Sequence, residues 1–311
     1  MPAKVPQIAS AKKIALMQFG GDRDRQFTAK LESYLAGIHV EGKPYFTLVD
    51  RELFDTILRE RNLQAESGVI NPEDSMTLGR LSGVDTVLSG QVSRPSFNSS
   101  IYKEDRKTCI VENDDGDCTK YRNYQASCRN DESKFEYSIR AINVETGDIV
   151  FIKSYDGRVE NSYCADKGES GIAYNDMMAM AMDKAINKMR NDVAPYEVWV
   201  TIDLMKEDES GLKGNPAAYQ YFENGLKLAG DNLIDAACEQ FQFAESAYKE
   251  SPAVYYNLGV CRELEQDFEK ALSLYSQAKV FLFKPDNQIE TAIARTKKMK
   301  IDSDTLSKQL R

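Results

Sequence analysis

The sequence predicts two folded parts: an N-terminal domain of the α+β class, arranged as an α-β sandwich, and an all-α C-terminal domain. Three observations support this prediction. Residues 12–205 alternate between strand-like apolar runs and apolar residues at helical spacing, and from about Tyr219 the chain repeats itself with a 34-residue offset. The polar, glycine-containing stretch 206–216 lies between the two patterns and is predicted to be a linker. Residues 1–11 and 302–311 are expected to be tails.

The predicted elements of the N-terminal domain follow from short apolar runs, helical periodicity and turn residues. In chain order they are a strand over Lys13–Phe19 ended by the turn Gly20–Asp22, a helix over Asp24–Ile38, a strand over Tyr45–Val49, a helix from Leu53 toward Leu63, a helix from Asn71 to Leu81, a strand over Val84–Val92, a hairpin of Phe135–Val144 and Ile149–Val159, a helix over Ala173–Met189 and a last strand over Val198–Ile202. Methionines and alanines form a broad apolar face on the 173–189 helix, which is typical of a core stripe rather than of a metal site.

Residues 94–133 interrupt the predicted sheet with polar, charged sequence. Four cysteines lie in this insertion or in similar loop-like sequence: Cys109, Cys118, Cys128 and Cys164. Such groups are typically joined as disulfides in an oxidising compartment, and their three possible pairings stay open. A structural zinc is the weaker alternative, because no Cys-x-x-Cys pair occurs and the only histidine, His39, lies far away. Cys238 and Cys261 fall inside the repeats and are expected to be small core residues.

The 34-residue repeat places the same kind of residue at each matching position. Gly225 matches Gly259, Phe241 matches Tyr275, and alanines recur between them. Small residues let two helices approach closely, and the aromatic rings fill the space between neighbouring hairpins. This is the tetratricopeptide (TPR) pattern, so residues 217–301 are predicted to form two TPR hairpins and a capping helix over Asn287–Met299.

The concave face of the two hairpins is the candidate partner-binding surface. Its predicted residues are Tyr219, Phe222, Leu226, Tyr256, Val260 and Glu263. One hypothesis is a groove for a peptide or a partner helix. The equally weighted alternative is that these residues pack against the N-terminal domain or another subunit.

Several short motifs of the N-terminal domain occur in the order found in CsgG-like domains. They are Ile14–Phe19, Leu48–Arg51 with Ile57–Glu60, Leu78–Asp85 leading to Leu88–Gly90, and Asn143–Gly147. Over residues 12–192 the chain resembles this family, which includes the curli secretion channel, a holdfast-attachment protein and the LpoB activators of peptidoglycan synthases. The resemblance implies a place in the bacterial envelope, often as a lipoprotein, and hence a signal and a lipidated cysteine ahead of Met1.

The insertion departs from the curli channel, which carries membrane-spanning hairpins at the matching places. A strand that faces lipid needs an uncharged outward row about 9–11 residues long. The charged runs Lys103–Lys107 and Glu112–Asp117 interrupt any such row. We therefore expect residues 94–133 to form a soluble, disulfide-tied flap.

No catalytic constellation is recognisable in the sequence. A single histidine gives little scope for a relay of Ser-His-Asp or Cys-His type, and no Walker loop occurs. Asn113–Gly116 lacks the first and twelfth ligands of a calcium loop, where Val111 and Arg122 stand. We therefore expect a protein that is not an enzyme and has no cofactor or metal. The formal net charge of −9 argues against a nucleic-acid partner.

These inferences predict a periplasmic scaffold or assembly factor tethered to the outer membrane, with membrane association only through the lost lipid anchor. Its repeats would recruit an envelope protein or peptide, and its CsgG-like domain would support homo-oligomers. One alternative is a ring-forming subunit of a surface-fibre or holdfast secretion or anchoring channel. The other is an LpoB-like activator of a peptidoglycan synthase.

Overall fold

The computed structural model describes residues 1–49, 76–77, 80, 83–282 and 284–310. The chain divides into two compact units, Ala3–Tyr196 and Glu197–Arg311 with Met1–Pro2, and each is described by itself. The helix predicted from Leu53 and most of the one predicted from Asn71 lie outside the described residues. Within the described part of the chain, no helix is long and apolar enough to cross a membrane.

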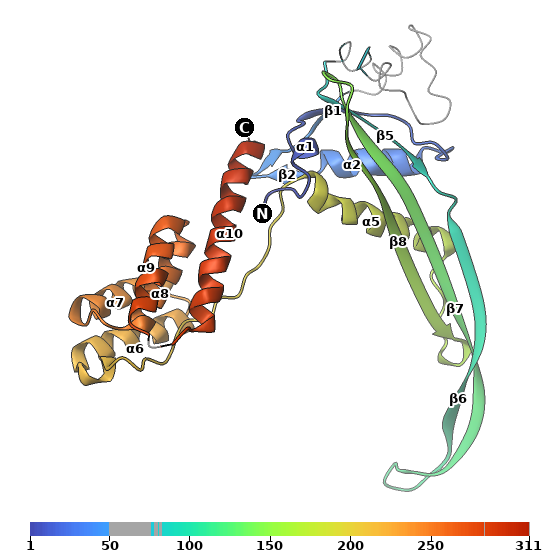
Figure 1. Cartoon of the computed structure of the whole chain (residues 1–311). Helices are drawn as coiled ribbons and strands as arrows, with labels where there is room; N and C mark the ends of the chain where they lie inside the picture. Colours follow the sequence, from blue (N-terminus) through green and yellow to red (C-terminus); the bar gives the residue numbers. More distant parts are fainter. Residues whose placement is uncertain (50–75, 78–79, 81–82, 283, 311) are drawn as a thin grey trace. The chain divides into compact units, whose positions relative to one another are not determined.

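A mixed six-stranded sheet forms the centre of the N-terminal unit (Figure 1). Its strands are β1 (Lys13–Leu16), β4 (Thr47–Leu48), β5 (Thr86–Val92), β6 (Ser96–Glu112), β7 (Cys118–Asn143) and β8 (Ile149–Cys164). The order is β4-β1-β5-β7-β6, and β8 pairs with β7. β1 runs parallel to β4 and β5, whereas the remaining pairings are antiparallel. A separate small ribbon joins β2 (His39–Val40) to β3 (Lys43–Pro44).

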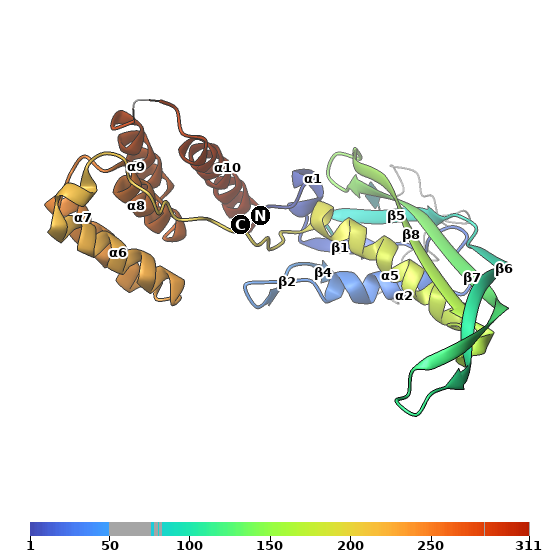
Figure 2. The ribbon, with the colours of Figure 1, turned by 90° about the horizontal axis from the view of Figure 1, so that it is seen from below.

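Helices α2 (Gln26–Ala36) and α5 (Tyr174–Val193) pack on one face of this sheet (Figure 2). The turn at Gly20–Asp22 starts α2, because the Asp22 carboxylate accepts hydrogen bonds from the backbone N–H groups of Phe27 (3.2 Å) and Thr28 (2.7 Å). A short helix, α1 (Pro6–Ala9), buries Ile8 and Ala9. The first eleven residues, predicted to be a tail, are therefore partly built into the N-terminal unit.

Aromatic rings from strand and helix meet in the core of this unit. Phe27 of α2 lies 4.6 Å from Tyr137 and 5.1 Å from Phe135, measured between ring centroids, and both partners belong to β7. The predicted apolar stripe of α5 faces this core, with Met177 and Met189 fully buried. The Tyr137 hydroxyl contacts the Met189 sulfur at 3.5 Å. The stripe is a packing surface, as predicted.

The predicted hairpin around Glu145–Asp148 is confirmed, but its strands are much longer than expected. β7 pairs with β8 from Ile142 opposite Ile149 as far as Cys128 opposite Cys164. Beyond that point β7 pairs only with β6, as a two-stranded arm that ends in the turn around Gly116. The expected flap over residues 94–133 is thus a regular hairpin. An arm exposed on both faces has no buried side, so its sequence carries no two-residue apolar alternation.

The helices of the C-terminal unit are α6 (Pro216–Gly230), α7 (Ile234–Ala247), α8 (Pro252–Leu264), α9 (Phe268–Val280) and α10 (Asn287–Leu310). They form two contacting pairs, α6 with α7 and α8 with α9, and the further helix α10 contacts α9. Side chains of Asn215, Ser251 and Asp267 cap α6, α8 and α9 by accepting backbone N–H groups. A Cβ on Gly225 would meet the Phe241 ring at 2.6 Å, and one on Gly259 would meet the Tyr275 ring at 2.4 Å. The repeated glycines therefore allow the close helix approach inferred from the sequence.

The boundary between the units differs from the prediction. It falls between Tyr196 and Glu197, so the segment 198–202, predicted to be the last strand of the N-terminal domain, belongs to the C-terminal unit and is not a strand. The predicted linker 206–216 is attached to the helices, since Leu212 is fully buried among them. The predicted tail 302–311 continues α10 as far as Leu310. Leu212 is buried among the helices and Ile202 packs against them, which attaches these stretches to the helical unit.

Candidate functional site

The six residues predicted to form the partner-binding face all point into the C-terminal unit. Phe222 is buried in one hydrophobic cluster, and Tyr219 and Leu226 pack against it. Tyr256 and Val260 are buried in a second cluster, and Glu263 is also buried. The structure places these residues on the expected helices but in two separate clusters, and other parts of the same unit cover them.

An extended segment covers part of this face. We call residues 201–209 the strap. The Asn257 side chain hydrogen-bonds both backbone groups of Met205: its Oδ1 accepts from the N–H at 2.8 Å and its Nδ2 donates to the C=O at 3.0 Å. The Asp203 carbonyl accepts from the Tyr256 hydroxyl at 3.1 Å and from the Gln288 amide at 2.8 Å. The helices thus hold the strap chiefly by its backbone.

Side chains anchor the strap at two further places. Leu204 and Met205 pack against both hydrophobic clusters of the unit. The Asp208 carboxylate accepts hydrogen bonds from the Ser251 hydroxyl at 2.5 Å and from the Ala253 N–H at 3.3 Å. Ser251 and Ala253 lie at the start of α8, where free N–H groups favour a carboxylate.

A cavity of about 900 Å³ lies along the strap. Its walls are the strap, the first residues of α8 and α10, and the loop before α10. Charged side chains of both signs line it, among them Asp203, Lys206, Lys284, Asp286 and Arg295. One side of the strap is therefore open to solvent and to any molecule that enters the cavity.

Glu263 holds α10 against α8. Its carboxylate accepts hydrogen bonds from Arg295 Nε at 2.7 Å and Nη2 at 2.9 Å, and from the Tyr275 hydroxyl at 2.7 Å. Burial disfavours the charged carboxylate, but the hydrogen bonds from Arg295 and Tyr275 outweigh this, so the pKa of Glu263 is lowered. In this structure the residue is an internal ion-pair partner rather than an exposed recognition group.

Two disulfides staple the β6–β7 arm. Cys109–Cys118 joins the strands near the tip, and Cys128–Cys164 lies where β8 stops pairing with β7. A two-stranded ribbon is marginally stable in water, so cross-links at these places offset the missing third strand. The prediction that these four cysteines form disulfides is confirmed, and the structure selects one of the three pairings.

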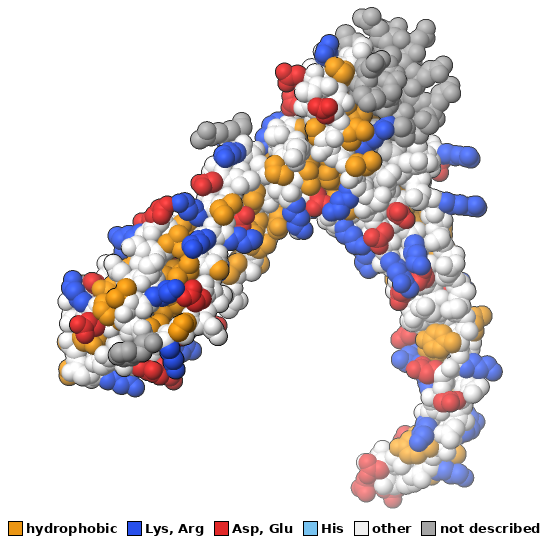
Figure 3. Space-filling model, viewed as in Figure 1, with side chains coloured by type: hydrophobic (Ala, Val, Ile, Leu, Met, Phe, Trp, Pro, Cys, Tyr) orange, Lys and Arg blue, Asp and Glu red, His pale blue; other side chains and the backbone are white. Residues whose placement is uncertain are grey.

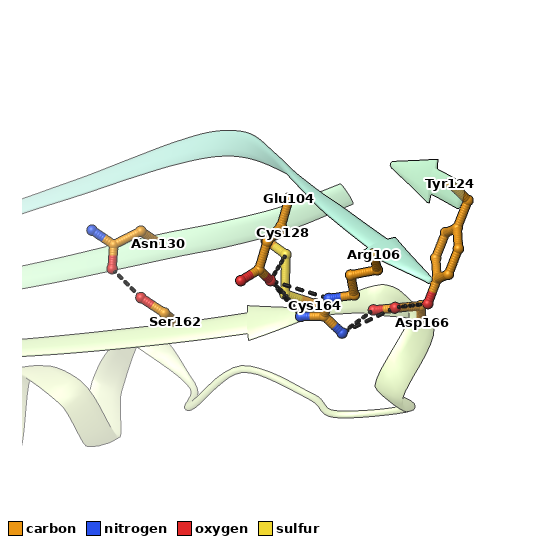
Figure 4. Close-up of a disulfide and its surroundings, with 8 residues drawn as sticks. All are labelled: Glu104, Arg106, Tyr124, Cys128, Asn130, Ser162, Cys164 and Asp166. Carbon is orange, nitrogen blue, oxygen red and sulfur yellow. Dashed lines mark hydrogen bonds and ion pairs between the residues drawn. A yellow bond between two sulfur atoms is a disulfide. The ribbon is translucent and has the colours of Figure 1, made fainter. Parts of the chain in front are cut away.

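Charged groups surround the Cys128–Cys164 disulfide (Figure 4). The Arg106 guanidinium lies between the Glu104 and Asp166 carboxylates, and the Tyr124 hydroxyl donates to Asp166 at 2.6 Å. The Tyr124 hydrogen bond and the Arg106 charge lower the pKa of Asp166. Glu104 and the two sulfurs lie close enough to suggest metal ligands. The sulfurs are bonded to each other and Glu104 is paired with Arg106, so this group does not fit a metal ion.

Cys238 and Cys261 also form a disulfide, which corrects their assignment as separate core residues. The bond joins α7 to α8, the last helix of one hairpin to the first of the next. The sequence shows only that both positions lie on helices. Their proximity depends on how the two hairpins stack, which the repeat offset alone does not give.

Within the described ranges, the remaining polar groups form no recognisable reaction centre. His39 is exposed, and its Nδ1 lies 2.9 Å from the Gly37 carbonyl oxygen. The arm carries Lys, Arg, Asp and Glu side chains interspersed along its length (Figure 3). Among the residues that the structure describes, the groove that holds the strap and the arm with its two disulfides are the candidate functional features.

The described residues thus fold into a mixed-sheet unit and a helical unit. Residues 41–193, which make up most of the mixed-sheet unit, match the family model described as curli production assembly/transport component CsgG. No protein of curated function matches the sequence. The structure is similar to that of a lipoprotein from Neisseria meningitidis, with 10% identity, a TM-score of 0.31, and coverage of 57% of this chain and 97% of that one.

Proposed function

We propose that the protein is a non-enzymatic scaffold or assembly factor of the bacterial envelope. The match of residues 41–193 to a family of assembly and transport components is the observation on which this proposal rests. The separate helical unit adds a second binding part to that domain. In this proposal each unit contributes one binding surface, so the protein can bring other proteins together.

We infer that α6–α9 are two TPR hairpins that recruit an envelope protein or peptide, with α10 as the capping helix. Support comes from the 34-residue spacing of Gly225 and Gly259, each of which faces the aromatic ring of its own hairpin. The groove already holds an extended segment, so its geometry suits extended peptides.

The proposed compartment is the periplasm, with tethering to the outer membrane. Three disulfides account for all six cysteines, which is typical of proteins that fold in an oxidising compartment. A cytoplasmic protein of this size would ordinarily keep its thiols reduced.

A ring-forming channel subunit is the second candidate, and one observation favours it. The long strand β6 pairs only with β7 among the described strands, so its outer edge is open along 17 residues. Open strand edges tend to pair with another chain. A second copy of this protein is the natural occupant in a ring.

Thiol counting tests the compartment. Protein isolated from cells without reductant and then unfolded should show none of its six cysteines reacting with a thiol reagent, and all six should react after reduction. Mass photometry of the same sample tests the channel alternative, since a closed ring of many copies would replace the scaffold proposal. If all six cysteines react without reduction, the envelope assignment is wrong.

A further inference from the structure

The apolar side chains of the strap are less buried than Leu212, which follows the strap in the chain. Leu204 and Met205 are only half-buried, whereas Leu212, a few residues later, is 0% exposed. Trp199, two residues before the strap, is 98% exposed. Gly211 has a φ of 101°, a conformation that favours glycine, and it separates the strap from the buried Leu212. The strap therefore lies between an exposed segment and a firm anchor.

The groove recognises the strap in a way that many sequences could satisfy. The contacts of Asn257, Tyr256 and Gln288 are all made to backbone atoms, which every residue except proline offers in full. Backbone recognition of an extended chain gives affinity, and side-chain pockets give specificity. The features that select a sequence are the two apolar anchors and the carboxylate of Asp208.

From this geometry we propose that the strap is an exchangeable occupant of the groove. The groove takes an extended peptide with two adjacent apolar residues followed, three positions after the second, by a carboxylate, as in Leu204, Met205 and Asp208. A partner with that pattern binds by displacing the strap while residues 210–215 stay in place. The inference rests on the proposed recruiting function of the helical unit, and it adds the class of ligand and the competitor.

Tethering makes the strap an effective competitor. A segment joined by a short linker acts at an effective concentration on the order of millimolar. If the strap binds the groove with an intrinsic Kd of about 50 µM, a free peptide would bind the native chain roughly 20-fold more weakly than a chain whose strap is disabled, since only the unoccupied fraction of grooves can accept it. Recruitment would be restricted to partners that bind more tightly than the strap does.

The test uses the full chain and a fluorescent peptide of residues 201–210. In one variant, Leu204→Gly with Met205→Gly removes both apolar anchors from the strap. In the matched control, Lys206→Gly with Glu207→Gly alters two exposed strap residues. We expect fluorescence anisotropy to show the peptide binding the first variant at least 10-fold more tightly than it binds the control or the native chain. A peptide with glycine at both anchor positions should not bind.

Native protein gives an independent measurement if the anchor variant does not fold. An excess of unlabelled 201–210 peptide should raise hydrogen exchange in strap residues 203–206, because the Met205 N–H loses its bond to Asn257. A folded anchor variant that binds no tighter than the control, or strap exchange that peptide does not change, would show that the strap is a fixed part of the unit. That outcome leaves the envelope assignment untouched, because thiol counting tests it separately.

Discussion

Replacing Glu263 with alanine is expected to lower the stability of the helical unit by about 3 kcal/mol. The Glu263 side chain is fully buried, and the substitution leaves the Arg295 guanidinium, 18% exposed, without its partner. Breaking a buried ion pair by removing one member typically destabilises by about 3–5 kcal/mol, and the residual exposure of Arg295 places this case at the lower end. Tyr275 loses its acceptor as well.

Glu269→Ala is the matched control. Glu269 pairs with Lys300 and so also links α9 to α10, but its side chain is 75% exposed. An ion pair in water contributes about 0–1 kcal/mol, so this variant should be close to native. Hydrogen exchange of the α9 and α10 amides measures the stability of the helical unit separately from that of the N-terminal unit. Equal effects of the two substitutions would contradict the assignment of Glu263 as the residue that holds α10.

The effect of Glu263 should depend on pH. The folded state holds its pKa below the ordinary value of 4.5, so the carboxylate contributes stability above that value and loses it as pH falls through the folded-state pKa. The difference between native chain and Glu263→Ala in α10 hydrogen exchange, corrected for the intrinsic pH dependence of exchange, should therefore be largest near neutral pH and shrink below pH 4.5. If the difference between the native chain and Glu263→Ala grew as the pH fell, it would contradict a lowered pKa of Glu263 in the folded state.

Periodicity and repeat spacing predicted the features that depend on local sequence. The turn of the hairpin around Glu145–Asp148 and the strand ends beside it follow from alternation and turn residues, and the positions of Gly225 and Gly259 follow from the 34-residue offset. The arm was not predicted as strands because both of its faces are exposed to solvent, so its sequence lacks the apolar alternation of a half-buried strand. The pairing of Cys238 with Cys261 was not predicted because it depends on hairpin stacking.

The six residues proposed for the partner-binding face lie on α6 and α8, because helical spacing fixes which residues of one helix share a face, but the apolar ones divide between two clusters. What covers them could not be inferred. Glu263 meets Arg295 across 32 positions of sequence, and Asn257 meets Met205 across 52. Such contacts are set by tertiary packing, and a polar stretch such as 201–209 carries no local sign that it will lie in a groove.

Gly157→Ala is expected to destabilise the N-terminal unit by about 3 kcal/mol or more. Gly157 lies in β8 where the strand passes directly under α5. A Cβ added there would stand 1.9 Å from the Ala181 carbonyl oxygen and 2.8 Å from the Ala185 N, both backbone atoms of α5. A flexible side chain could move aside, but the helix backbone cannot move without separating from the sheet. A glycine within a strand pattern is a sign of such close approach.

The matched control is Asp156→Ala, one position earlier in the same strand. Asp156 points to solvent, with a side chain 68% exposed and paired with Lys188, so its loss should change stability by no more than about 0.5 kcal/mol. Hydrogen exchange of α5 amides reports the affected contact directly. We expect protection to fall along α5 in Gly157→Ala and to stay native in Asp156→Ala. Native protection of α5 in both would mean that β8 and α5 are not held at this distance, and the packing that anchors α5 to the sheet would then need another explanation.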